Sequence, residues 1–153
     1  CVQFFHALSN FDWTRPTALH IKELSYSERG TMTLEYSIDV EKKIVLSIGS
    51  DTLTDADVLS HRNRLARDPL LDPTQYNHLV DLTQVERLEL SQETIQSIVR
   101  NNPWGKGSRR AMVASSKVIF GISRMIQLSL EDQGDETHVF DNLEEAKVWL
   151  GLK

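Results

Sequence analysis

A junction between a predicted strand and a predicted helix carries the residues best suited to chemistry. Asp81 closes an apolar run, Thr83 follows it, and Ser91 stands where a helix is expected to begin. Open α/β sheets bind ligands at the carboxyl ends of their strands, and helix N-termini favour anions. We therefore predict that Asp81, Thr83 and Ser91 bind a partner or ligand, with Ser91 also a candidate for phosphorylation. The structural alternatives are helix capping by Ser91 and an Asx-type turn at Asp81.

A glycine-rich basic segment, WGKGSRR, spans residues 104–110. It differs from a P-loop because Gly follows its Lys and because a strand is predicted after it. Its cations and glycines beside an aromatic ring could still hold an anion or an acidic partner. Trp104 and Arg110 are therefore candidate binding residues, and a solvated loop is the alternative.

The predicted helix 117–131 offers another candidate surface. Phe120 and Arg124 lie four residues apart and share one face of this helix. If exposed, they form the kind of aromatic and arginine pair that dominates protein interfaces, and if the face packs on the sheet, Phe120 belongs to the core. The helix is apolar around much of its girth, which favours a second packing surface. We expect Gly121 to permit close packing there.

The histidines show no metal-ligand spacing. They are His6, His20, His61, His78 and His138. No nucleophile-elbow pattern supports a Ser/His/Asp set either. We therefore predict no metal site, no cofactor and no enzymatic activity, and we expect His138 to be structural.

Hydrophobic periodicity predicts the elements that position these residues, in the order ββαβαβαβα. Helices between strands imply largely parallel pairing, and an opening hairpin makes the sheet mixed. The fold class is therefore α/β, with a mixed, mostly parallel sheet of about five strands and about four helices. The predicted strands are 33–38, 44–48, 79–82, 110–114 and 137–140; the predicted helices are one capped by Thr54 and ended by Asp68-Pro69, then 91–102, 117–131 and 143–150.

Composition excludes several classes of protein. The chain of 153 residues is 40% apolar and 25% charged, an ordinary globular balance, and its net charge of −5 argues against a nucleic-acid binder. The one cysteine, Cys1, cannot form an internal disulfide, so a reducing, cytoplasmic compartment is expected. No apolar run approaches the ~20 residues that span a bilayer. We expect residues 1–31 to be an N-terminal extension and residues 32–153 to be the folded domain.

The element order and the junction resemble the STAS domain, the SpoIIAA-like fold of anti-sigma factor antagonists. In those proteins a strand ending in D-L-S precedes a V-E-x-x-D-S-S turn, and Asp81-Leu82-Thr83 and VERLELS at 85–91 run at the same spacing. The segments FGISRM at 120–125 and EEA at 144–146 are similar to small bacterial SpoIIAA-like proteins. The first Ser of D-S-S is the phosphoacceptor in the antagonists. Leu90 stands at that position here, so the resemblance does not carry over a kinase-regulated switch.

The resemblance implies a non-enzymatic regulatory or protein-interaction module of the STAS type, active in signalling in a bacterial cytoplasm. Its partner would be another protein or a second copy, forming a homodimer through the surface around Phe120. The alternative is a carrier of a small ligand, either a lipid or an anionic metabolite. In that case an apolar pocket lies between sheet and helices, and Arg110 or Arg124 contacts an anionic head.

Overall fold

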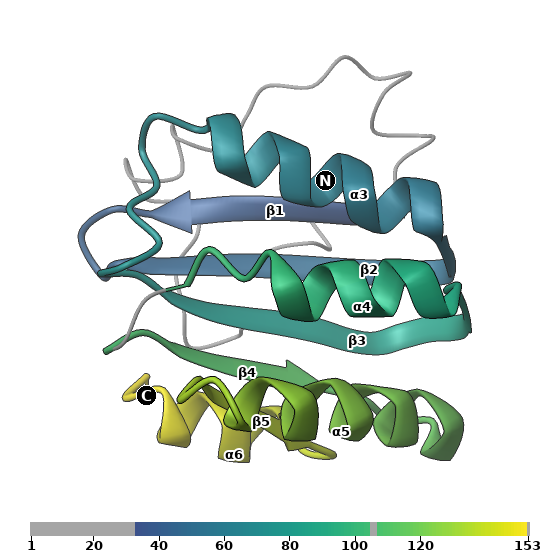
Figure 1. The fold of residues 1–153 in the computed structure, drawn as a ribbon. Coiled ribbons are helices and arrows are strands. Elements are labelled where there is room, and N and C mark those ends of the chain that lie inside the picture. Colours follow the sequence, from purple (N-terminus) through teal and green to yellow (C-terminus); the bar gives the residue numbers. More distant parts are fainter. Residues whose placement is uncertain (1–32, 105–106, 153) are drawn as a thin grey trace.

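The computed structural model describes residues 33–104 and 107–152, so the expected extension 1–31 lies outside the described residues. The described part is a five-stranded sheet with helices on both faces (Figure 1). Its strands are β1 (Leu34–Asp39), β2 (Ile44–Thr54), β3 (Asn77–Glu89), β4 (Arg109–Val113) and β5 (Glu136–Phe140). Its helices are α3 (Asp55–Arg67), α4 (Gln92–Arg100), α5 (Lys117–Glu131) and α6 (Leu143–Trp149).

The strand order in the sheet follows the chain from β1 to β5. β1 pairs with β2 antiparallel, and the other neighbours pair parallel, which confirms the predicted mixed α/β architecture. Successive right-handed crossovers in one direction place their helices on the same face of a sheet. Accordingly α3, α4 and α5 cover one face, and α6 covers the other (Figure 1). No helix among the described residues is long and apolar enough to cross a membrane.

Local signals set the helix starts as predicted. Thr54 caps α3 in a capping box with Asp57, whose carboxylate accepts from the Thr54 backbone N–H at 2.9 Å. Ser91 caps α4 and Ser116 caps α5 through their side-chain oxygens. Each cap satisfies a backbone N–H that the first helical turn leaves without a partner.

β3 is much longer than the predicted strand 79–82, and this expectation was wrong. The strand continues to Glu89 because β2 continues to Thr54, and residues 50–54 pair with residues 84–89 beyond the point where β4 ends. The long pairing satisfies backbone groups that a turn would have left to solvent. Asp81 therefore lies inside a strand and does not close one.

Candidate functional site: a cavity between the sheet and helices α3 to α5

A cavity of about 520 Å³ lies on the face of the sheet that α3, α4 and α5 cover. Val80, Leu82 and Met112 belong to its floor, and Ile126 and Ile98 line it from α5 and α4. This volume lies within the range of small-molecule binding sites, which are mostly apolar with a few polar groups.

The cavity exists because α4 does not pack its apolar face down onto the sheet. Thr94 is the buried residue of α4, and Ile95, Ile98 and Val99 are only partly buried. The helix is strongly amphipathic in sequence, and Ser97 and Ile98 are its residues that line the cavity.

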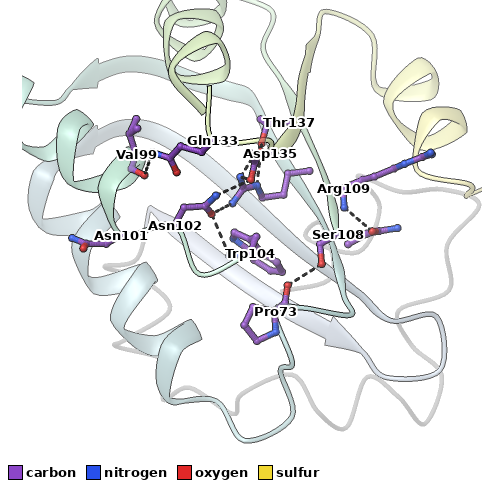
Figure 2. Close-up of polar contacts among 12 residues, drawn as sticks. Pro73, Val99, Asn101, Asn102, Trp104, Ser108, Arg109, Gln133, Asp135 and Thr137 are labelled. Atoms are coloured by element: carbon purple, nitrogen blue, oxygen red, sulfur yellow. Dashed lines mark hydrogen bonds and ion pairs between the residues drawn. The ribbon is translucent and has the colours of Figure 1, made fainter. Parts of the chain in front are cut away.

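Polar contacts hold α4 in place at both ends. At its start, the Ser91 backbone N–H donates to the Asp55 carboxylate of α3 at 2.8 Å. Near its end, Gln133 donates to the Val99 carbonyl at 3.0 Å (Figure 2). α4 is thereby tied to the helices on either side and spans the space between them.

One end of the cavity is polar because of a single register row across the sheet. His78 of β3 is paired with Arg110 of β4, and Arg110 is paired with Thr137 of β5. Side chains alternate along a strand, so these three point to the same face. The next row on that face includes Val80 and Met112. The floor therefore changes from polar at the amino ends of the parallel strands to apolar towards their carboxyl ends.

Arg110 is held by a complete set of partners at this polar end. Its Nη1 donates to the Asn102 side-chain oxygen at 2.6 Å, its Nε donates to Thr137 Oγ1 at 3.1 Å, and it forms an ion pair with Asp135 (Figure 2). Its guanidinium lies 5.7 Å from the centre of the Trp104 ring. Burial lowers the pKa of Arg110, and the charge of Asp135 opposes that shift. The positive charge of Arg110 is thus compensated within the protein.

Two buried histidines share one serine hydroxyl beside this end. The Ser47 Oγ lies 2.8 Å from the Nε2 atoms of both His61 and His78. Burial, with the charges of Arg64 and Arg62, lowers the pKa of His61 to about 3, and burial also lowers the pKa of His78 well below its ordinary value. Both rings are therefore neutral at neutral pH. Because a hydroxyl carries one proton and two acceptor lone pairs, Ser47 can donate to only one ring, so at least one of the two histidines carries its proton on Nε2 and donates it to Ser47.

Of the predicted site residues, the structure brings Trp104 and Arg110 together at the cavity. Asp81 lies on the opposite face with Leu79, which packs in the cluster beneath α6. The Asp81 carboxylate accepts from both the backbone N–H and the hydroxyl of Thr83, at 2.9 and 2.6 Å. This is the Asx-type arrangement given as the structural alternative. Ligand binding by Asp81 and Thr83 stays a prediction.

Ser91 is exposed at the start of α4, where its hydroxyl accepts from the Thr94 backbone N–H at 3.1 Å. Hydrogen bonds from the Ser91 backbone and side chain lower the pKa of the Asp55 carboxyl. The capping role is therefore confirmed. Phosphorylation of Ser91 stays a prediction, and a phosphate there would lie close to the Asp55 carboxylate.

The predicted pair on α5 is divided between core and solvent. Phe120 packs against the cluster that contains Leu53 and Leu82, whereas Arg124 is exposed. The expectation for Gly121 was wrong: it is exposed, and a Cβ added there would meet no atom within 4 Å. Gly121 therefore has no packing role among the described residues.

The residues that sequence reasoning missed are Ser47, His61 and His78. A signal for them was present, because His78 alternates with Val80 on the inward side of its strand and His61 lies four residues before Leu65 on the inward side of α3. His138, expected to be structural, is exposed and contacts the Trp149 ring at 4.8 Å between centres. Within residues 33–104 and 107–152, no group of three His, Cys, Asp or Glu side chains is placed to hold a metal ion.

The sequence and the fold can be compared with known proteins. No protein-family model and no curated protein matches the sequence. A solved structure from Shewanella loihica PV-4 is similar, with a TM-score of 0.52 and 15% identity over 76% of this chain and 91% of that chain. It is described as an uncharacterized protein from the DUF3478 family with a SpoIIAA-like fold. This chain accordingly has a SpoIIAA-like fold.

Proposed function

We propose that this domain binds a small amphipathic molecule between its sheet and helices α3 to α5. The observation that carries the proposal is the cavity of about 520 Å³, which is apolar along most of its length and polar at one end. Concave, mostly apolar pockets of this size with a few polar groups are the usual form of small-molecule binding sites. Of the two functions expected from sequence, the carrier is the one that this geometry favours.

An unpartnered hydroxyl in the cavity wall supports the proposal. Ser123 of α5 is 1% exposed, and its Oγ has no hydrogen-bond partner among the described residues. Ser123 also lines the cavity. A buried polar atom without a partner carries a desolvation cost of roughly 1–3 kcal/mol, which a hydrogen bond from a ligand would remove.

Filling the cavity tests this function. Ser123→Leu places an apolar side chain in the space beside Ile126, while Ser60→Leu makes the same change at an exposed site on α3. We expect wild type and Ser60→Leu to bind the dye anilinonaphthalene sulfonate saturably at one site, and Ser123→Leu to lose that binding while staying folded by circular dichroism. Absence of saturable binding to the wild type, or equal binding by Ser123→Leu, would contradict the proposal.

The second candidate function is an interaction module that pairs with a second copy through α5. Val118, Met125 and Leu128 are exposed at 70%, 49% and 50%, on a helix whose other apolar side chains face the sheet. The helix begins at Lys117 and ends at Glu131. An antiparallel pair of α5 helices would bring these opposite charges and opposed dipoles together, which supports a second copy as the partner.

Light scattering at increasing protein concentration tests the pairing. We expect a dimer that Met125→Glu dissociates, with Val148→Glu on α6 as the matched control because Val148 is also exposed and apolar. Phe120 is unsuitable for this test because it packs in the core cluster. A protein that is monomeric at high concentration, or a dimer unaffected by Met125→Glu, would exclude this interface.

A further inference from the structure

We propose that the ligand is an amphipathic monocarboxylic acid and that Arg62 binds its carboxylate. The inference rests on the proposed ligand-binding function and specifies its chemistry. It also differs from the expectation that Arg110 or Arg124 contacts an anionic head.

Arg62 lines the cavity from α3. Its Nη2 donates to the carbonyl of Asn101 at the end of α4, at 2.6 Å. Within the described part of the chain, its guanidinium has no carboxylate partner, and the second N–H of Nη2 can still form a two-donor edge with Nε or Nη1. A guanidinium edge with two N–H donors matches the two oxygens of a carboxylate.

The two arginines predicted from sequence are unsuitable for this role. Arg110 is already bonded to Asn102 and Thr137 and paired with Asp135. Arg124 is exposed on α5 and does not line the cavity. Arg62 is therefore the cavity arginine whose charge is left for a ligand.

The charges at the polar end leave room for one anion. Arg110 is paired with Asp135, Arg62 has no ion pair with a carboxylate among the described residues, and the nearby His61 and His78 are neutral. Burial lowers the pKa of Arg62, as expected for a cation removed from water without a compensating anion. One negative charge neutralises this end. A phosphate dianion would leave an excess charge in a partly buried site, and a cationic head would be repelled.

The rest of the cavity suits an apolar chain. Beyond the polar row, it is lined by aliphatic side chains from the strands and from the β3–α4 junction. These are Leu34, Leu53, Val80, Leu82, Leu88 and Leu90. An acid oriented with its carboxylate at Arg62 buries its hydrocarbon against these residues, where each methylene contributes roughly 0.8 kcal/mol.

Calorimetric titration of the full chain with decanoate and with decanol tests the inference, because the two probes share a chain and differ in the head. We expect decanoate to bind wild type about tenfold more tightly than decanol. Arg62→Gln should remove that preference while leaving decanol affinity unchanged. Arg67→Gln, an exposed arginine on the same helix, should leave both affinities as in wild type.

The outcomes separate the two levels of the proposal. If neither probe binds wild type, the ligand-binding function itself fails. If both bind wild type equally, the domain binds apolar chains but the carboxylate assignment is wrong, whatever the variant does. If decanoate is preferred and Arg62→Gln retains the preference, another group binds the head. Should Arg62→Gln fail to fold by circular dichroism, Arg62→Lys keeps the charge but loses the two-donor edge, and unchanged decanoate binding by it would overturn the role of Arg62.

Discussion

Lowering the pH from 7 to 5 should destabilise this protein through His61 and His78. Both rings are buried at 5% exposure and both are bonded to Ser47. Because burial lowers the folded-state pKa of each, the unfolded chain takes up protons that the folded protein excludes. Stability is therefore lost as the pH falls below the unfolded value of about 6.5, and for His61 the loss continues to about pH 3.

The size of the His61 contribution follows from the difference between its unfolded and folded pKa values. For each histidine that stays neutral in the folded protein, the free energy of unfolding falls by about 1.4 kcal/mol per pH unit below the unfolded pKa. Between pH 6.5 and pH 5 the loss is about 2 kcal/mol for His61, and His78 adds a loss of the same sign. Small domains have a total free energy of unfolding of about 5–15 kcal/mol, so the loss is readily measured.

Urea unfolding at the two pH values provides the assay. In His61→Gln the side-chain amide can still bond Ser47 but cannot titrate, so this variant should lose about 2 kcal/mol less than wild type between pH 7 and pH 5. His138→Gln removes an exposed histidine and should behave like wild type. An equal pH-linked loss in wild type, His61→Gln and His78→Gln would refute the reasoning.

Three further predictions concern stability and can be checked by urea unfolding at neutral pH. Gly49→Ala should lower the free energy of unfolding by about 1–3 kcal/mol, because the added Cβ would lie 2.9 Å from Val85 Cγ2. Gly121→Ala should raise the free energy of unfolding by about 1 kcal/mol, because the site is helical and open. A Gly49→Ala variant more stable than Gly121→Ala would contradict both predictions. Ser91→Ala should cost about 1 kcal/mol through loss of the α4 cap, and Ser91→Asn should restore most of it. Ser123→Ala should stabilise the ligand-free protein by roughly 1 kcal/mol, since it removes a buried hydroxyl without a described partner; a loss of similar size would indicate a hidden hydrogen bond.

Local sequence determined much of the architecture. The starts of α3 and α4 follow from Thr54 and Ser91, because a cap is an interaction within one helical turn. Alternation of apolar residues located the strands, and helices between strands implied parallel pairing, which the sheet confirms. These features depend on residues within a few positions of one another, so they can be predicted from the sequence.

Tertiary structure alone decided the length of β3 and the location of the cavity. Residues 84–89 form a strand because they pair with residues 50–54. These segments are distant in the sequence, and no local pattern predicts their pairing. Ser47 meets His61 and His78 within the β2–α3–β3 crossover. Arg110 is bonded by Thr137 of β5 and by Asp135, which directly precedes that strand. The polar residues of the sequence indicated which groups could bind a ligand. The packing of distant parts of the chain decides which of these polar groups remain unpaired and therefore available to a ligand.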